Sequence, residues 1–335
     1  MLNKSQKLNP DLFKKDVLKE TPRRGFGEGL VLAGEKNKDV VVLCADLTES
    51  THSDLFRGAF PDRFFEMGIA EQNMASVASG MSAMGKIPFI ASYAIFSPGR
   101  NWEQIRTTIC YNDRQVILAG THAGLSVGAD GGSHQALEDI ALMRVMPNMT
   151  VISPCDSLEA RKATLASIEV VNPVYIRLSR DKTAIITTEE TPFKIGKAQI
   201  FYGAEDEKVD VGIIATGPIL YKALKVAEQL KKENISVKVL NISTIKLLDN
   251  EAVIKLAKET GRVVTVEDHQ IAGGLGSAVS ECLSQNFPVP IEFVGVHDKF
   301  GQSGTPEELF KHYEIDEPAI LKAVKKVIAK SNFLK

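Results

Sequence analysis

The sequence predicts an α/β protein of two domains, each built on a sheet of parallel strands flanked by helices. Apolar runs typical of buried strands alternate with helical patterns along most of the chain. The alternation lapses once, in a Thr-, Lys- and Glu-rich stretch at 183–208 that we interpret as a linker plus an edge strand. The chain has 335 residues, enough for about two domains. Strand–helix alternation is typical of parallel sheets covered on both faces.

The first half of the chain supplies four clear strands and five helices. The apolar runs are residues 39–45, 87–93, 115–121 and 173–178, and a shorter run lies at 63–66. The helical patterns are residues 25–36, 70–84, 101–111, 134–144 and 156–168.

The second half repeats the alternation, with a mostly parallel sheet expected. Its strands are predicted at 209–216, 236–242, 262–267 and 290–296, and its helices at 218–232, 249–260 and 274–285. We therefore divide the chain into an N-terminal arm (1–17), a first domain (18–185), a linker (186–196) and a second domain (197–335). The arm is polar and charged, so we expect it to be disordered or to become ordered on a partner.

Composition excludes several classes of protein. The formal net charge is −2 and no long basic run occurs, which argues against a nucleic-acid surface. No apolar run reaches the roughly 18–20 residues of a membrane-spanning helix, and the N-terminus lacks the apolar core of a secretory signal. The four cysteines are scattered, with no metal-ligand spacing, so we expect reduced and mostly buried thiols in a cytoplasmic protein.

Polar and aromatic side chains follow the predicted strands of the first domain, where an open parallel sheet binds its ligands. The candidates that follow these strands are Asp46, Leu47, Ser50, Glu71, Tyr93, Phe96, His122, Asp130, His134 and Arg180, and Arg23 is a further candidate that precedes the helical pattern at 25–36. Packing alone does not explain so many chemically active groups at one edge of a sheet.

Several candidates also have a simpler structural interpretation. Glu71 begins a long helix, where a carboxylate favours the helix dipole, but small neighbours also predict that it is poorly solvated and suited to proton sharing. Tyr93 and Phe96 are core aromatics or a platform for a flat heterocycle. His122 and His134 are surface or capping residues, or hydrogen-bond partners of a hydroxylated substrate.

The arginines and a glycine-rich turn also allow two interpretations each. Arg23 and Arg180 are solvated surface residues, or forks for a phosphate or carboxylate. In the second domain, residues 272–277 (AGGLGS) open a helix but lack the full dinucleotide pattern, so a tight strand–helix turn is the better interpretation.

Four segments together resemble the transketolase family. They are CADLTES (44–50), GIAEQNM (68–74), THAGLSVGADGGSHQALEDIALMRVMPNM (121–149) and LSRD (178–181). The resemblance covers about residues 20–330 and implies a thiamine-diphosphate-binding fold: a pyrimidine-binding domain followed by the transketolase C-terminal domain. The glutamate motif is shared by several thiamine enzymes, whereas the Gly128–Gln135 loop narrows the family to transketolases and deoxyxylulose-phosphate synthases.

The resemblance implies a role for each candidate. Glu71 matches the glutamate that hydrogen-bonds the cofactor's pyrimidine and promotes its imino tautomer, and His134 matches a histidine that transfers protons beside the reacting oxygens. Further cofactor contacts are implied for Phe96, Tyr93, Asp46 and Leu47. Substrate contacts are implied for Asp130, which would bind a substrate hydroxyl, and for the phosphate-binding residues His122, Arg180, Ser50 and Arg23. No metal ligand is implied on this chain.

Two departures from the family pattern qualify the resemblance. Full-length transketolases carry a GDG motif followed by an Asn, which hold the divalent metal (Mg²⁺ or Ca²⁺) and so the diphosphate. That motif is absent here, and the short stretch before the first domain leaves no room for it. We therefore expect the C-terminal subunit of a split transketolase, assembled as α2β2 with an N-terminal subunit that carries GDG…N. Ser97-Pro98-Gly99 also replaces bulkier residues beside Phe96.

The implied reaction is transfer of a two-carbon ketol unit from a ketose phosphate to an aldose phosphate. Three alternatives remain: the β subunit of a 2-oxoacid dehydrogenase E1, an enzyme similar to deoxyxylulose-phosphate synthase, and a non-catalytic homologue. The ADGGSHQ pattern argues against the dehydrogenase, and the joint presence of Glu71, Asp130, His134 and Arg180 argues against a non-catalytic protein.

Overall fold

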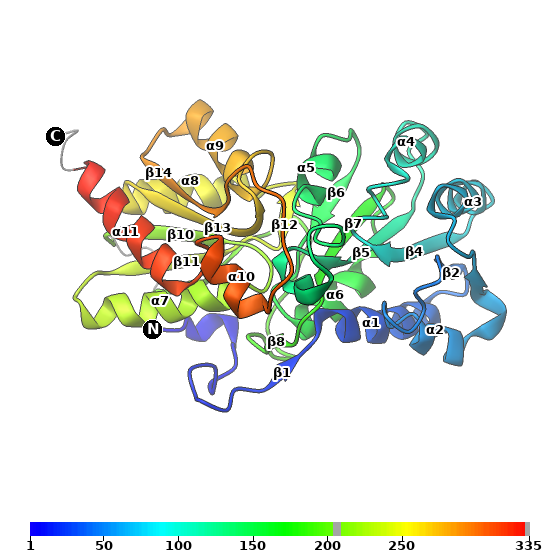
Figure 1. Cartoon of the computed structure of the whole chain (residues 1–335), viewed down its shortest axis with the longest axis horizontal. Coiled ribbons are helices and arrows are strands. Elements are labelled where there is room, and N and C mark those ends of the chain that lie inside the picture. Colours follow the sequence, from blue (N-terminus) through cyan, green and yellow to red (C-terminus); the bar gives the residue numbers. More distant parts are fainter. Residues whose placement is uncertain (204–208, 332–335) are drawn as a thin grey trace.

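Two helix-flanked sheets organise the chain in the computed structural model, which describes residues 1–203 and 209–331. The two domains lie side by side, and the N-terminus lies at the second domain (Figure 1). The predicted fold class is confirmed: the first sheet is parallel except for one edge strand, and the second is mostly parallel.

The first sheet has the strand order β12-β6-β7-β5-β4-β2-β3. Its strands are β2 (Val40–Cys44), β3 (Phe64–Glu66), β4 (Ile87–Tyr93), β5 (Ile117–Ala123), β6 (Thr150–Ile152), β7 (Val174–Ser179) and β12 (Thr244–Lys246). Its helices are α1 (Pro22–Lys36), α2 (Asp54–Ala59), α3 (Glu71–Ala83), α4 (Trp102–Gln104), the π-helix Ile105–Cys110, α5 (Asp139–Arg144) and α6 (Ser157–Ser167).

Strand β2 shows why the apolar runs predict this sheet. Val40 and Val42 are buried in the same core as Phe26 of α1, while Val41 and Leu43 are buried with Met74 of α3. Successive side chains of a strand point to opposite faces, so a strand covered by helices on both faces is apolar at every position. All five residues of β2 are buried.

The second sheet has the order β14-β13-β10-β11-β9. Its strands are β9 (Gln199–Tyr202), β10 (Val211–Ala215), β11 (Val237–Asn241), β13 (Val263–Gln270) and β14 (Ile291–Val296). Its helices are α7 (Leu220–Lys232), α8 (Asn250–Thr260), α9 (Leu275–Asn286), α10 (Pro306–His312) and α11 (Glu317–Ser331). The antiparallel strand β9 confirms the edge strand expected within 183–208.

Several elements differ from the prediction. Strands β6 and β12 were not expected, yet β12, from the second half of the sequence, pairs antiparallel with β6 at the edge of the first sheet. Helices α2, α10 and α11 were not expected either. The helix predicted at 134–144 begins only at Asp139, because residues 131–135 belong to hydrogen-bonded turns such as that from His134 N to Gly131 O (3.0 Å).

The expectation that residues 1–17 are disordered or await a partner is wrong. Leu8, Leu12 and Val17 are buried in the second domain's core. The arm's backbone is also fixed, since Asn9 N donates to Ile186 O at 2.9 Å. Farther on, β1 (Lys19–Glu20) pairs antiparallel with β8 (Thr183–Ala184). Single leucines spaced among charged residues gave no periodic pattern from which this packing could be inferred. The exact domain boundaries stay a prediction.

All four cysteines are free and buried, as the sequence predicted. Among the helices within 1–203 and 209–331, none combines the length and the apolar character needed to cross a membrane.

Candidate active site

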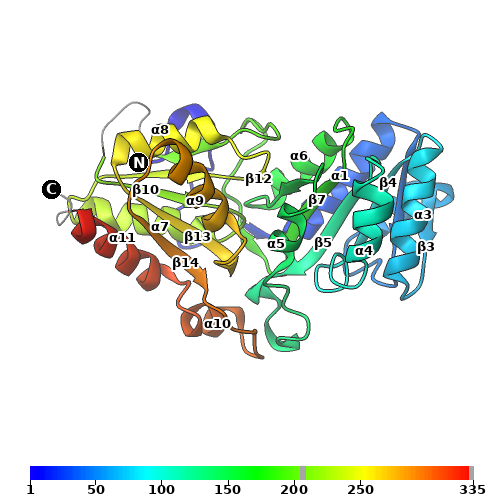
Figure 2. The same ribbon diagram turned by 90° about the horizontal axis from the view of Figure 1, so that it is seen from above.

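The predicted site residues follow neighbouring strands of the first sheet. Strands β2, β4, β5 and β7 run parallel and pair in the order β2-β4-β5-β7. The loops that follow them therefore meet at one edge of the sheet, as the sequence indicated. The loop after β5 lies beside the segment that leads into α10 of the second domain (Figure 2).

Four aromatic side chains meet at this edge. The rings of Tyr93 and His122 are stacked with centroids 3.7 Å apart, and those of Tyr93 and Phe96 are stacked at 5.9 Å. His134, from the glycine-rich loop, places its ring edge against Phe96 at 5.5 Å. The loops after β4 and β5 thus join Tyr93, Phe96, His122 and His134 into one cluster.

Glu71 lies at the start of α3 with only 4% of its side chain exposed, which confirms the predicted poor solvation. Arg100 Nη1 lies 3.2 Å from Glu71 Oε1 and 3.3 Å from Oε2. The guanidinium also lies over the Phe96 ring, 4.1 Å from its centroid. Arg100 therefore joins the buried carboxylate to the aromatic cluster.

Sequence reasoning missed Arg100 and its neighbour Asn101. Asn101 Nδ2 donates to the Glu71 carbonyl at 3.1 Å and to Ser97 Oγ at 3.1 Å, so it fixes the start of α3 against the loop after β4. The pair Arg-Asn directly after Ser97-Pro98-Gly99 was the available signal, because a turn there returns the chain toward Phe96.

A positively charged corner lies beside the aromatic cluster. Arg23 Nη2 donates to the Arg180 carbonyl at 2.8 Å, Nη1 donates to the Ser50 carbonyl, and Nη1 lies 3.4 Å from His122 Nε2. Arg180 donates to the Val127 carbonyl, and its Nη1 lies 3.5 Å from Asp130 Oδ1. Five predicted substrate residues, Arg23, Ser50, His122, Asp130 and Arg180, are thus brought together.

Burial and the two arginines determine the charge state of this corner. Burial, assisted by the charges of Arg23 and Arg180, lowers the pKa of His122 to about 2. His122 is therefore a neutral imidazole at physiological pH and provides hydrogen bonding rather than charge. Burial also lowers the pKa of Arg23, whose Nε is buried without a hydrogen-bond partner among the described residues.

Asp46 and Leu47 lie at the same sheet edge, after β2. Asp46 is exposed and has a positive φ of 56°. Its backbone N donates to Glu66 Oε1 at 2.7 Å, and Thr48 Oγ1 donates to Glu66 Oε2 at 2.7 Å. Leu47 packs in part against the core beneath α1. Glu66, which sequence reasoning missed, therefore shapes this loop; an acidic residue at the end of a strand was its signal.

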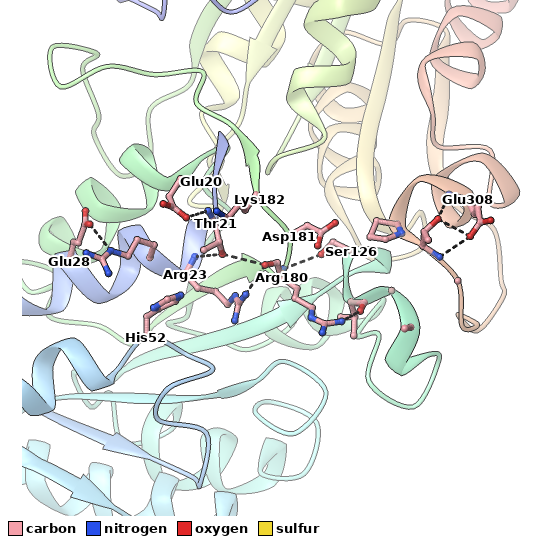
Figure 3. Close-up of a pocket in the computed structure, with 17 residues that line it drawn as sticks. Glu20, Thr21, Arg23, Glu28, His52, Ser126, Arg180, Asp181, Lys182 and Glu308 are labelled. Carbon is pink, nitrogen blue, oxygen red and sulfur yellow. Dashed lines mark hydrogen bonds and ion pairs between the residues drawn. The ribbon is translucent and has the colours of Figure 1, made fainter. Parts of the chain in front are cut away.

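A cleft of about 1090 Å³ opens beside this corner (Figure 3). Arg23, His52 and Arg180 line it from the first domain, and residues 304–306 and Glu308 line it from the second. Burial and the charge of Arg23 lower the pKa of His52, so this ring too is mostly neutral. His52 and the second-domain wall were not predicted from the sequence.

Comparison with known proteins decides the family. The family model of the transketolase pyrimidine-binding domain matches residues 20–184, and that of the transketolase C-terminal domain matches residues 203–320. The chain belongs to the transketolase family. The resemblance seen in the sequence is therefore confirmed for both domains.

Three members of the transketolase family define the extent of the likeness. A protein of Methanocaldococcus jannaschii, whose name describes a transketolase C-terminal section, is 44% identical over 305 residues, which cover 90% of this chain and 94% of that protein. Human transketolase is 37% identical over 311 residues, 92% of this chain but 49% of the human protein. A solved split-gene transketolase, an inactive β4 tetramer, superposes with a TM-score of 0.85 at 43% identity, covering 92% and 98% of the two chains.

The glycine-rich turn of the C-terminal domain does not form a phosphate site. Leu275 N and Gly276 N at the start of α9 donate to the buried Glu267 carboxylate at 2.7 and 2.8 Å. A Cβ on Gly276 would lie 2.6 Å from the Phe293 ring. The segment is the tight strand–helix turn that the sequence favoured, and a carboxylate already binds its free N–H groups.

The transketolase family implies thiamine diphosphate, and the residues present fit its aminopyrimidine ring. Glu71 offers a buried acceptor, and Tyr93 and Phe96 offer half-buried ring faces beside it. Arg100 now lies over Phe96 and beside Glu71. A heterocycle stacked on that face of Phe96 would need the half-exposed guanidinium of Arg100 to move aside.

Proposed function

We propose that this chain is the C-terminal subunit of a two-chain, thiamine-diphosphate-dependent transketolase. The reaction is transfer of a two-carbon ketol unit from a ketose phosphate to an aldose phosphate. The chain supplies the pyrimidine-activating glutamate and the sugar-phosphate site, within the boundaries predicted for its two domains and in the cytoplasm.

The observation that carries the proposal is the pairing of two unlike sites at one sheet edge. Glu71, a buried carboxylate beside Phe96, suits activation of a heterocyclic cofactor. The corner formed by Arg23 and Arg180 lies at the same sheet edge and suits a phosphate dianion. His122 stacks on Tyr93 and lies 3.4 Å from Arg23, so it joins the two sites.

We assign the residues the roles that the family resemblance implies, and their surroundings support these roles. When bound, thiamine diphosphate supplies the carbon nucleophile that attacks the substrate carbonyl. Glu71 would share a proton with the N1′ ring nitrogen of the pyrimidine, Phe96 and Tyr93 would hold the ring, and Asp46 and Leu47 would lie at its margin. His134 moves protons at the substrate's hydroxyl and carbonyl oxygens.

The remaining predicted residues recognise the substrate. Arg23 and Arg180 carry the positive charge that faces the phosphate, and Ser50 and neutral His122 add hydrogen bonds. Asp130 binds a sugar hydroxyl, since its carboxylate lies 3.5 Å from Arg180 and is only partly covered.

We propose a separate N-terminal subunit as the second half of the site. It would carry the GDG…N motif, hold the diphosphate through Mg²⁺ or Ca²⁺, and assemble with this chain as α2β2. Two comparisons support this: the chain matches 49% of human transketolase and almost the full length of a C-terminal section. No Gly-Asp-Gly sequence occurs in its 335 residues.

Turnover after reconstitution tests the proposal. The chain is mixed with the product of a GDG…N-encoding gene, thiamine diphosphate and Mg²⁺, and assayed with xylulose 5-phosphate and ribose 5-phosphate. Sedoheptulose phosphate formation is expected. Pyruvate oxidation with a dye acceptor instead would indicate a 2-oxoacid dehydrogenase subunit, and condensation of pyruvate with glyceraldehyde phosphate would indicate a deoxyxylulose-phosphate synthase. Tight cofactor binding without any turnover would indicate a non-catalytic homologue.

A further inference from the structure

We infer that the C-terminal domain serves as a template that holds the substrate loop in its working shape, and that Gln135 is the positioning residue of this contact. The substrate loop is residues 124–135, which carry Asp130 and His134. The template segment is residues 300–306, which precede and enter α10. Figure 2 shows the loop and this segment side by side.

The substrate loop is built from short turns rather than from a long regular element. Gly124, Gly128 and Gly131 all have φ near +75°, a conformation that glycine adopts without strain. Residues Leu125–Asp130 form 3₁₀ turns interrupted at Gly128, and Gly131 N closes a further turn by donating to Gly128 O at 3.1 Å. Arg180 of the first domain also donates to the Val127 carbonyl. Short turns of this kind depend on contacts from outside the loop to keep one conformation.

The C-terminal domain supplies those contacts at both ends of the loop. At the start, Leu125 N donates to Asp268 Oδ1 at 3.0 Å. After the end, Gln270 N donates to the Leu137 carbonyl at 2.8 Å. Leu125 and Leu137 are both buried in the core of the C-terminal domain. The loop's ends are therefore fixed to a different domain from the one whose sheet it follows.

Gln135 joins the middle of the loop to the template segment. Its Nε2 donates to the Gly128 carbonyl at 3.1 Å and to the Gln302 carbonyl at 3.0 Å, and only 2% of the residue is exposed. One side-chain amide thus spans the turn that carries Asp130 and ties it to the C-terminal domain. His134, the proposed proton-transfer residue, is adjacent to Gln135 in the chain.

Glycines on both sides allow this close approach. A Cβ on Gly132 would lie 2.4 Å from the Gly301 carbonyl O, and a Cβ on Gly131 would lie 2.7 Å from Ser303 Oγ. A Cβ on Gly301 would lie 1.7 Å from Gln135 Oε1. At Gly132 the two backbones therefore approach without an intervening side chain, and at Gly131 and Gly301 only a side-chain oxygen lies between them, which makes the fit sensitive to a single methyl group.

The template segment is itself rigid. Thr305 and Glu308 form a capping box at the start of α10, and Tyr313 Oη donates to the Phe300 carbonyl at 2.7 Å. Both ends of the segment are thus fixed before it meets the loop. A domain without an evident catalytic group would in this way control the shape of the substrate site. The inference rests on the proposed function only for the roles of Asp130 and His134.

Hydrogen exchange on the full-length chain alone tests the template. Gln135→Met keeps the length of the side chain but removes both donated hydrogen bonds. Amides of the substrate loop are expected to exchange about tenfold to 100-fold faster, because each of the two hydrogen bonds contributes about a threefold to tenfold factor. Gly132→Ala, which forces the backbones apart, should produce the same local change.

Gln302→Ala is the matched control. Its exposed side chain is lost while its carbonyl, the group that accepts from Gln135, remains. Exchange in this variant should equal that of the wild type. Unchanged loop exchange in both Gln135→Met and Gly132→Ala, or an equal rise in strands β4 and β5, overturns the inference.

The reconstituted pair provides a second readout. Gln135→Met should lower kcat/KM for the ketose phosphate about tenfold while leaving the Kd of thiamine diphosphate within about twofold, because Glu71 and Phe96 lie outside the loop. Equal loss of both would indicate general damage and refute a positioning role. If the pair shows no transketolase turnover at all, the exchange result still decides the inference about the template.

Discussion

Replacing Glu71 by Gln should abolish most activity of the assembled enzyme with little effect on folding. Gln keeps the size and one acceptor oxygen of Glu but cannot share a proton with the cofactor. Loss of a positioned proton-transfer group typically lowers a rate about 10²- to 10⁴-fold. That range equals about 3–5 kcal/mol of transition-state stabilisation.

The effect on stability is expected to be much smaller. The Arg100 side chain is 51% exposed, so its ion pair with Glu71 is worth about 0.2–1 kcal/mol. The favourable position of the carboxylate at the start of α3 adds about 0.3–1 kcal/mol. Removing a charge that is only 4% exposed offsets part of this loss. We expect a decrease in Tm below about 4 °C.

Turnover and thermal unfolding, measured on the same preparation, separate the two effects. Glu103→Gln is the control, because Glu103 is an exposed acid in the first turn of the neighbouring helix α4. It should show wild-type turnover and Tm. Near-normal turnover of Glu71→Gln would refute the assigned role, and a large drop in Tm would show that Glu71 acts mainly in folding.

Three further predictions concern the cofactor, the phosphate and a buried carboxyl group. The isolated chain should bind thiamine diphosphate weakly and without dependence on Mg²⁺; tight Mg²⁺-dependent binding in calorimetry would contradict the need for a partner. Arg180→Ala should raise KM for the sugar phosphate about 10- to 100-fold, the value of a charge-assisted hydrogen bond, whereas Arg57→Ala, at a surface ion pair with Glu49, should not. Burial raises the pKa of Glu159 from 4.5 to about 7, so its protonated form favours folding below pH 4.5 and about 3 kcal/mol is lost as the pH rises to 7. Glu159→Gln should remove this pH dependence of the free energy of unfolding, measured by urea unfolding at pH 5 and 8. An equal pH dependence in the variant and the wild type would contradict the prediction.

The fold was predictable where burial is two-sided. Runs such as 39–45 and 87–93 are almost entirely apolar because helices cover both faces of the sheet. Strand β6 was not predicted, because three residues between two helices are too few to show a periodic pattern. Its partner β12 is distant in sequence, and pairing between domains leaves no local pattern. The packing of the arm was not predicted for a similar reason, since Leu8 and Leu12 are buried by second-domain residues that are distant in the sequence.

Most residues of the site could be predicted from the sequence, but the contacts between them could not. The carboxyl ends of parallel strands gather at one edge, so Tyr93, Phe96, His122 and Arg180 could be placed at a common edge from their positions at or after the ends of predicted strands. Arg100 could not, because its approach to Glu71 depends on the path of the chain after Ser97. Nor could Gln135, whose acceptor is a backbone carbonyl 167 residues away in the sequence.

The charge states in the corner of Arg23 and Arg180 could not be predicted from residue type either. Two arginines and a histidine suggest three positive charges, yet His122 is neutral because burial and the arginines lower its pKa. The guanidiniums of Arg23 and Arg180 bind mainly backbone carbonyls, and Asp130 approaches Arg180 only to 3.5 Å. Carbonyl dipoles orient these cations without neutralising them. Among the described residues Arg23 forms no ion pair with a carboxylate, and Arg180 forms only the 3.5 Å pair with the partly exposed Asp130. This remaining positive charge supports the phosphate dianion that we propose as the ligand.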